Sequence, residues 1–348
     1  MPHRHEVQLG PTRGQDRVHP CDMILFDAAA PTNANCSRRS LYTTMPGLIA
    51  ALSTLFRTAL LPALLLAPFS SPAQAPAPQS PPIQSPPIQS PPIHGLAHIA
   101  VRVADIAATR AFYEKLGYQQ AFAMEKNGTT TQSFIKVNDR QFIELYPKTE
   151  AQPLGFMHLC FDGEDLNALH DFDVAQGLTP ISVRKAGAGN LLFTLRGPED
   201  QNIEYTQYMP GSLHYEDRGK HLGLAEGSNA SSARIADSFF AVGLSMKDPA
   251  AASTYYISKL GFAPIGGKAN LLLIPGSKSP GATEETQQIL IQPLTSPVSR
   301  IFLTVPDLGK TAAELKKRGI AFKAAKHELT VTDPDGNLLV FTTRKIAA

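Results

Sequence analysis

Apolar and polar residues alternate along short stretches of the chain beyond residue 94, a pattern typical of half-buried β-strands. In the stretch LAHIAVRV, residues 96–103, the odd positions, which begin at Ala97, are all apolar. The even positions are mixed: Leu96, His98, Ala100 and Arg102. The stretch therefore predicts a strand with one apolar face, formed by the odd positions, and one mixed face that carries His98.

A helical pattern follows each strand of this kind, beginning at an aspartate and ending at a glycine. It occurs four times, at 105–117, 165–177, 248–261 and 307–319. Aspartate accepts hydrogen bonds from the free N–H groups at a helix start, and glycine tolerates the left-handed conformation at its end. Three short strand-like stretches come after each helix, in the first copy around 118–124, 131–137 and 141–146. The chain beyond residue 94 thus repeats one unit, strand–helix–three strands, four times.

One such unit has a curved sheet covered by a helix on a single face, so two units side by side are expected to enclose a concave cavity. We predict an α+β fold of four βαβββ modules in two consecutive domains, each a curved mixed sheet around a cavity with helices outside. The first domain covers residues 94–210 (modules 94–147 and 155–209) and the second covers residues 236–345. A segment rich in glycine, serine and charge, residues 211–235, is the predicted connector.

Two stretches carry a family resemblance: LAHIAVRVADIAATRAFYEKLGY, residues 96–118, and DPDGNLLVF, residues 333–341. They resemble the vicinal oxygen chelate superfamily, which includes glyoxalase I, methylmalonyl-CoA epimerase, extradiol dioxygenases and the fosfomycin- and bleomycin-resistance proteins. The resemblance extends over residues 94–345 and implies glyoxalase-like domains. It does not choose among the chemistries that the superfamily hosts.

Two histidines and two glutamates recur at matching places in the first two modules. His98 and His158 lie in the first strands of these modules, and Glu144 and Glu204 lie in the last strands, each 46 residues after its histidine. Strand alternation allows all four side chains to point into one cavity. Two neutral imidazoles and two carboxylates suit one divalent ion, Ni, Zn, Mn, Co or Fe, and without an ion the carboxylates would repel each other. The glyoxalase-like members hold their metal at these four positions, so the resemblance implies the same ligands.

The third and fourth modules lack such residues. Their matching positions offer Phe240 or Ala241, Ile301 or Phe302, Leu290 and Val340, none of which ligates a metal. Only the pairing of module one with module two unites the four ligands within a chain, so we predict an active first domain and a degenerate second domain. A homodimer that exchanges equivalent modules would assemble the same set, and both a monomer and a homodimer are compatible with the sequence.

The expected function is metal-dependent proton transfer, as in an isomerase or lyase. A metal with two open positions binds neighbouring substrate oxygens and favours loss of an adjacent proton. By resemblance to glyoxalase I, Glu204 or Glu144 would serve as ligand and general base. Candidate substrate-binding residues share strand faces with the ligands: Arg102, Tyr146 and Tyr208.

Two alternatives remain open from the sequence. A ring-cleaving dioxygenase would use His98, His158 and Glu204 around Fe(II). A non-catalytic binding protein of the resistance type would hold a small molecule without transforming it. All three hypotheses have a small molecule as the partner.

The first ninety residues carry targeting signals instead of fold. Residues 1–44 show no sustained periodicity and are expected to be disordered or to precede the true start, Met45. Residues 45–75 have the layout of a secretory signal peptide, with Arg57 before an apolar run at 59–69. Residues 76–93, with three QSPPI repeats, predict an extended linker. We therefore expect export to the periplasm or the medium, with no stable membrane span after processing.

Charge and cysteine content exclude further classes. The net charge is +2 and no basic run occurs, so nucleic acid is not an expected partner. The three cysteines, Cys21, Cys36 and Cys160, are too few and too scattered for a disulfide framework or a thiolate metal site.

Overall fold

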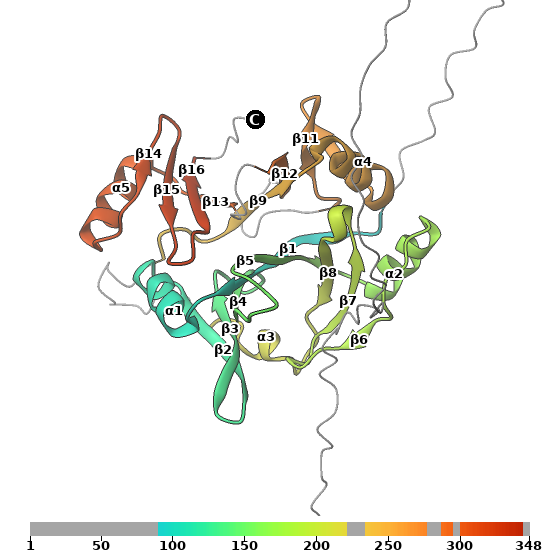
Figure 1. Ribbon diagram of the computed structural model, residues 1–348, viewed down its shortest axis with the longest axis horizontal. Coiled ribbons are helices and arrows are strands. Elements are labelled where there is room, and N and C mark those ends of the chain that lie inside the picture. The colour runs from blue at the N-terminus through green and yellow to red at the C-terminus, as the bar shows by residue number, and fades with distance from the viewer. Residues whose placement is uncertain (1–89, 221–233, 277–286, 295–299, 344–348) are drawn as a thin grey trace, which may run out of the picture. The chain divides into compact units, whose positions relative to one another are not determined.

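Two eight-stranded mixed sheets organise the chain in the computed structural model (Figure 1). The structure describes residues 90–220, 234–276, 287–294 and 300–343, all of which belong to one unit, Gln79–Ala348. The segments predicted at 1–44 and 45–75, and the predicted linker up to residue 89, lie outside the described residues.

The first sheet has the strand order β2-β3-β4-β1-β5-β8-β7-β6. Its strands are β1 Ile93–Val103, β2 Gln119–Lys126, β3 Thr129–Lys136, β4 Phe142–Pro147, β5 Gly155–Gly163, β6 Arg184–Lys185, β7 Leu191–Arg196 and β8 Asn202–Gln207. Helix α1, Ile106–Lys115, follows β1, and helix α2, Leu166–Ala175, follows β5. A 3-10 turn, η1 Pro198–Asp200, precedes β8, and the short helix α3, Leu213–Glu216, follows it.

The second sheet repeats this order as β10-β11-β12-β9-β13-β16-β15-β14. Its strands are β9 Phe239–Met246, β10 Ala263–Ile265, β11 Lys268–Leu273, β12 Gln288–Pro293, β13 Arg300–Thr304, β14 Lys323–Ala324, β15 Glu328–Thr332 and β16 Leu338–Thr342. Helix α4, Pro249–Leu260, follows β9, and helix α5, Leu308–Lys317, follows β13. Among the described residues, no helix has the length and apolar composition needed to cross a bilayer.

The strand order confirms the predicted fold class. Each of the four modules runs strand, helix, three strands, and the first strands of two modules pair antiparallel at the centre of each sheet, β1 with β5 and β9 with β13. Modules one and two therefore share one sheet, and modules three and four share the other. The fold is α+β, with two consecutive glyoxalase-like domains.

The helix signals in the sequence are confirmed as well. All four predicted aspartates cap a helix by accepting backbone N–H groups: Asp105, Asp165, Asp248 and Asp307. The four predicted glycines just beyond the helices have φ between 67° and 87°: Gly117, Gly177, Gly261 and Gly319. Residues with a Cβ avoid this region, so glycine there ends each helix with little strain.

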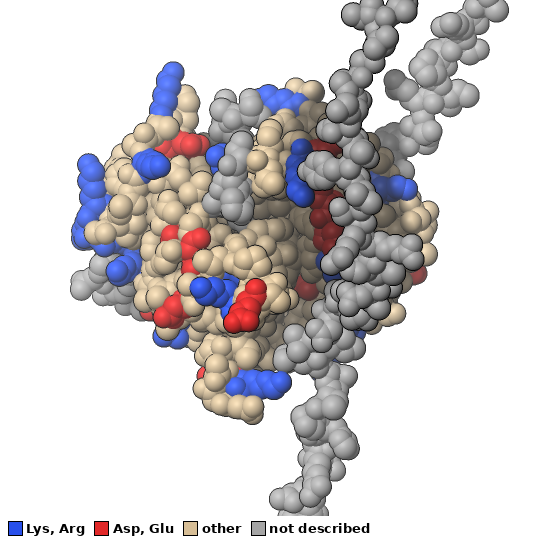
Figure 2. Space-filling view, in the orientation of Figure 1, with Lys and Arg blue, Asp and Glu red and all other residues tan. Residues whose placement is uncertain are grey.

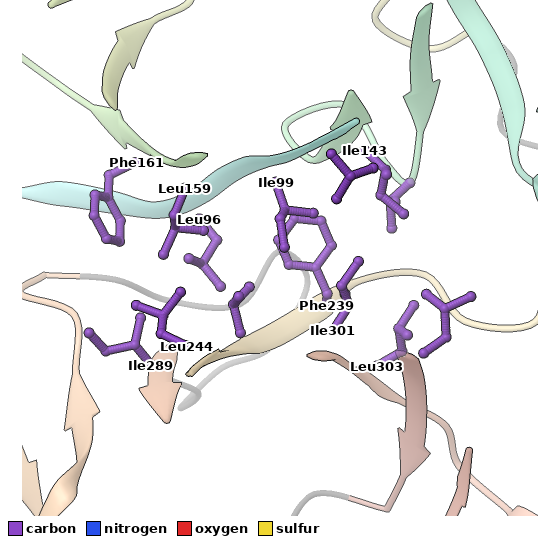
Figure 3. Packing of buried hydrophobic residues seen from close by; sticks show 14 of the residues in the cluster. Leu96, Ile99, Ile143, Leu159, Phe161, Phe239, Leu244, Ile289, Ile301 and Leu303 are labelled. Carbon is purple, nitrogen blue, oxygen red and sulfur yellow. The ribbon is translucent and has the colours of Figure 1, made fainter. Parts of the chain in front are cut away.

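The two sheets share one apolar core, formed between the faces that point toward each other (Figure 3). Ile99 of the first sheet lies opposite Phe239 and Ile301 of the second, and Leu159 lies opposite Leu244. Each such side chain contributes about 1.5–3 kcal/mol when it is fully buried. Helices α1 and α2 pack on the same face of the first sheet, which leaves its concave face free for a separate cluster of residues.

Strand β1 departs from the alternation that its sequence predicts. Leu96 pairs with Phe161, but the next pair is His98 with Cys160, so one extra residue lies between them in β1. A bulge of this kind shifts the residues before it onto the other face. Leu96 therefore points into the shared core (Figure 3), whereas Ala97 packs beside Cys160 on the concave side. The prediction that Leu96 shares a face with His98 was wrong, because alternation between two apolar residues does not reveal a bulge.

Charges are dispersed on the surface that Figure 2 shows. Lysine and arginine side chains are interspersed there with aspartates and glutamates, in keeping with the net charge of +2.

Candidate metal centre

The four predicted ligands come from four adjacent strands in the middle of the first sheet. Glu144 lies on β4, His98 on β1, His158 on β5 and Glu204 on β8, and the sheet order is β4-β1-β5-β8. His98, Glu144 and His158 are each 3% exposed, and the Glu204 side chain is 12% exposed. The module repeat therefore brings all four residues to the concave face of one domain.

Three of the four form a compact group of donor atoms. His98 Nε2 lies 3.0 Å from His158 Nε2 and 3.3 Å from Glu204 Oε1. One donor atom from each of the three residues lies within 4.8 Å of the others, so the group could hold a metal ion. Two histidines and one carboxylate are a common ligand set for divalent transition metals.

Glu144 approaches the same His98 ring from its other side. Its Oε1 lies 3.2 Å from His98 Nδ1. Its Oε2 accepts hydrogen bonds from Gln132 Nε2, at 2.9 Å, and from the Tyr146 hydroxyl, at 3.1 Å. Nδ1 itself makes no hydrogen bond among the described residues, so Glu144 acts on the His98 ring through its charge and proximity and not as a hydrogen-bond acceptor.

Burial controls the protonation of the four side chains. It lowers the pKa of His98 to about 3 and that of His158 to about 4, so both imidazoles are neutral at physiological pH. Burial also raises the pKa of Glu204, and burial together with the charge of Glu204 raises the pKa of Glu144 well above its usual range. The group is thus short of positive charge, which a bound divalent cation would supply.

The spacing of the donor atoms also fits an ion. Two nitrogens bound to one metal at about 2.1 Å, with bonds at right angles, are about 3.0 Å apart. His98 Nε2 and His158 Nε2 have this separation. The residues present therefore suit a divalent metal in donor type, charge and spacing.

The predicted substrate-binding residues lie at two levels of the concave face. Arg102 and Tyr146 are neighbours in the register of β1 and β4, and the Tyr146 ring centre lies 6.3 Å from that of His158. Arg102 is half-buried, and its guanidinium donates to the Pro147 carbonyl at 3.4 Å. Tyr208 lies apart from them, in the concave cluster, and its hydroxyl donates to the carbonyl of Arg140 at 3.2 Å.

Two polar residues of this face were not found from the sequence. Gln132, on β3, holds Glu144, and its place two residues before Phe134 on the same strand face is the signal that could have indicated it. His214, on α3, is 3% exposed and packs against four aromatic rings. It falls in the segment predicted as a connector, where no periodic pattern marks an inward face.

The second domain carries no such ligands at the matching positions. The structure corrects one of the positions that the sequence repeat had matched. Strand pairing places Ala241, Leu290 and Val340 at the positions of His98, Glu144 and Glu204, as predicted. The counterpart of His158 is Arg300, and Phe302 matches Cys160 instead. The offset within a short strand depends on its pairing partners, which the sequence of the strand does not reveal.

One family model matches the part of the chain that carries these residues. Residues 95–205 match the family model described as the Glyoxalase/Bleomycin resistance protein/Dioxygenase superfamily. No protein of curated function matches the sequence at a significant level.

Solved structures with a similar fold include two dioxygenases and one glyoxalase. The 2,3-dioxygenase LapB from Pseudomonas sp. KL28 is 13% identical, with a TM-score of 0.52 over 72% of this chain and 92% of that chain. The Mn(II)-bound glyoxalase from Novosphingobium aromaticivorans is 15% identical, with a TM-score of 0.53 over 72% and 82%. Homoprotocatechuate 2,3-dioxygenase from Arthrobacter globiformis is 14% identical, with a TM-score of 0.50 over 74% and 82%. At these identities the likeness is one of fold.

Proposed function

Because the chain belongs, through residues 95–205, to the Glyoxalase/Bleomycin resistance protein/Dioxygenase superfamily, we propose that it is a divalent-metal enzyme acting on a small molecule with two neighbouring oxygen atoms. The observation that carries this proposal is the buried group of His98, His158 and Glu204 on the concave face. These three side chains would hold the ion.

Among the reactions of the superfamily, we propose oxidative ring cleavage on Fe(II). The position of Glu144 supports it, because this carboxylate lies at Nδ1 of His98 and leaves two histidines and one carboxylate as the compact ligand set. Such a facial set is typical of non-haem Fe(II) oxygenases and would leave positions for the substrate oxygens and O₂. Two of the similar folds named above are also dioxygenases.

The surrounding side chains would bind and orient the substrate. Burial raises the pKa of Tyr146 well above its usual range, so its hydroxyl keeps the proton that it donates to Glu144, and its ring beside His158 would form a wall of the substrate site. Gln132 fixes the carboxylate of Glu144, whose other oxygen lies 3.2 Å from His98 Nδ1. Arg102, half-buried beside Tyr146, would attract an anionic substrate.

Proton transfer of the glyoxalase type is the second candidate, and the environment of Glu144 favours it. This carboxylate is buried and its pKa is raised, which are the properties of a general base. In that reaction Glu144 would act as a fourth ligand, as the sequence pattern predicts.

Metal content of ligand variants tests the proposal and separates the two candidates. We expect the protein loaded anaerobically with Fe(II) or Mn(II) to hold about one ion per chain, measured by mass spectrometry of the metal. His98→Ala and Glu204→Gln should lose it. Glu144→Gln should retain it if three residues ligate, whereas loss in Glu144→Gln would support the four-ligand site. A parent protein that holds no metal under any loading would contradict a metal enzyme and leave the binding-protein alternative.

Turnover assays then distinguish the reactions. With catechol as the probe, the Fe(II) protein should consume O₂ and form a yellow ring-cleavage product. With the hemithioacetal of methylglyoxal and glutathione, a glyoxalase-type enzyme should act without O₂. Activity on the hemithioacetal and none on catechol would contradict ring cleavage and favour proton transfer of the glyoxalase type.

Export through residues 45–75 is proposed on the sequence alone. The expected mature chain begins at or just after Ala75 and is recovered from the periplasm or the medium. Mass spectrometry of the amino terminus measures this, and a soluble protein that still carries Met1 would contradict it.

A further inference from the structure

A third histidine lies on the concave face of the first domain, outside the proposed ligand set. His214, on α3, is 3% exposed. Neither of its ring nitrogens has a hydrogen-bond partner among the described residues. An imidazole carries one donor and one acceptor, and leaving such groups buried and unpaired lowers stability. A buried group of this kind needs a reason, and a ligand of the site is one.

Aromatic rings enclose this imidazole. Its ring centre lies 4.8 Å from that of Phe122, 5.2 Å from Phe134, 4.9 Å from Phe142 and 4.8 Å from Tyr208. These rings come from β2, β3, β4 and the segment after β8. The enclosure has the apolar, planar walls that suit an aromatic ligand.

The enclosure adjoins the candidate metal centre. Phe142 of the enclosure and Cys160, which packs in the same apolar cluster, both pair in register with His98. Cys160 also pairs with Glu204. His214, which packs against Phe142, therefore lies on the same concave face as the three-residue group.

Specific contacts hold α3 in this position. The Ser212 side chain caps the helix by accepting the N–H of Tyr215, and the N–H of Leu213 donates to the Ala188 carbonyl at 2.8 Å. On the opposite side, the buried ammonium of Lys136 lies 2.9 Å from Asp217 Oδ2 and donates to its carbonyl.

These contacts attach α3 to strands near the two opposite edges of the first sheet. Ala188 belongs to the loop between β6 and β7, and Lys136 ends β3. In Figure 1, α3 lies between these two edges of the sheet. The same edges approach each other elsewhere, because a Cβ at Gly187 would lie 3.3 Å from Met124. A helix fixed at both sides places His214 reproducibly, which a substrate-binding role requires.

We propose that His214 is a substrate-binding residue, and that the substrate is an aromatic ring with two neighbouring oxygens at the metal group and a polar substituent that hydrogen-bonds His214. The inference rests on the proposed function and specifies its substrate class. Burial lowers the pKa of His214 to about 3, so the ring that meets the substituent is neutral.

Two probes that differ only in the distal substituent test this inference in the metal-loaded protein. Catechol provides only the two neighbouring oxygens. The second probe, 4-nitrocatechol, also has a nitro group that accepts hydrogen bonds, and its binding is followed by its visible absorption. We expect His214→Phe, which preserves an aromatic ring without nitrogens, to weaken 4-nitrocatechol binding about tenfold more than it weakens catechol binding. His214→Gln, which restores a donor, should recover most of the difference.

The possible outcomes separate this inference from the proposed function. Equal affinity of parent and His214→Phe for 4-nitrocatechol would overturn the role of His214, as would an equal loss for both probes in a folded, metal-loaded variant. Circular dichroism and metal content establish that the variant is folded and loaded. A parent protein that takes up no metal would overturn the proposed function, and the substrate class inferred from it would fall as well.

Discussion

At the residue scale, the polar side chains buried on the concave face are explained by the candidate site, whereas Asp173 is not. This residue of α2 is 1% exposed, and its Oδ2 has no hydrogen-bond partner among the described residues. Burial raises the pKa of its carboxyl from 3.8 to about 7. It also lies in the last turn of its helix, where a negative charge is unfavourable.

Asp173→Asn should therefore stabilise the protein at alkaline pH. The folded state keeps the Asp173 proton up to about pH 7, whereas the unfolded chain loses it near pH 4, so stability falls as the pH rises between these values. The substitution should raise the free energy of unfolding at pH 8 by up to about 4 kcal/mol and leave it nearly unchanged at pH 4. Urea unfolding at the two pH values measures this.

Asp171, on the same helix with a side chain that is 85% exposed, provides the control. Asp171→Asn should show no such pH-dependent gain. A similar gain from both substitutions would mean that general charge, and not the burial of Asp173, is responsible.

At the scale of the element, the four equivalent helices show how a short local signal sets a boundary. Asp165 accepts the N–H groups of Asn167 and Ala168 at 3.0 and 3.1 Å, and the helix ends just before Gly177. The same arrangement recurs at the other three helices. These contacts are between residues close in sequence, which is why the pattern was readable before the fold was known.

Asp165→Ala should cost about 1 kcal/mol of stability, because two N–H groups at the start of α2 lose their acceptor. Chemical unfolding at pH 7 measures the change. Glu164→Ala, at the exposed residue just before the cap, is the matched control and should change the stability by less than about 0.5 kcal/mol. An equal effect of the two substitutions would contradict the capping role.

At the scale of the whole molecule, two equivalent turns join the domains. The turn after β15 reaches α1, where Asp335 accepts the Thr109 hydroxyl at 2.6 Å and Asp333 accepts the Tyr113 hydroxyl at 3.2 Å. The turn before β8 reaches α4 in the same way, with Gln201 accepting the Tyr256 hydroxyl at 3.1 Å. Because of these contacts and the shared apolar core, we expect the second domain to brace the first.

Ending the chain after Ser232 should leave the first domain poorly stable. The face that carries Ile99, Leu159 and Phe161 would be exposed as a continuous apolar patch, which favours aggregation. Size-exclusion chromatography and thermal unfolding of the fragment test this expectation. A soluble monomer with the thermal stability and metal content of the full chain would contradict the bracing role.

The sequence determined those features that depend on residues near one another or on exact repetition. Local caps and alternation predicted the helices and most strands, and the repeated spacing of His98, Glu144, His158 and Glu204 placed them on four adjacent strands of one sheet. Lack of ligands in modules three and four also followed from the repeat, because equivalent positions in equivalent strands occupy equivalent places in the fold.

Only the tertiary structure decided what depends on pairing between distant strands and on side-chain packing. The bulge in β1, the match of Arg300 to His158 and the position of Glu144 on the far side of His98 all depend on register or rotamer, which alternation does not encode. His214 enters the concave face because Lys136 and Ala188, distant in sequence, hold its helix from both sides. The sequence by itself thus specified the fold and its four acidic and imidazole side chains, and long-range contacts specified which atoms of those side chains meet.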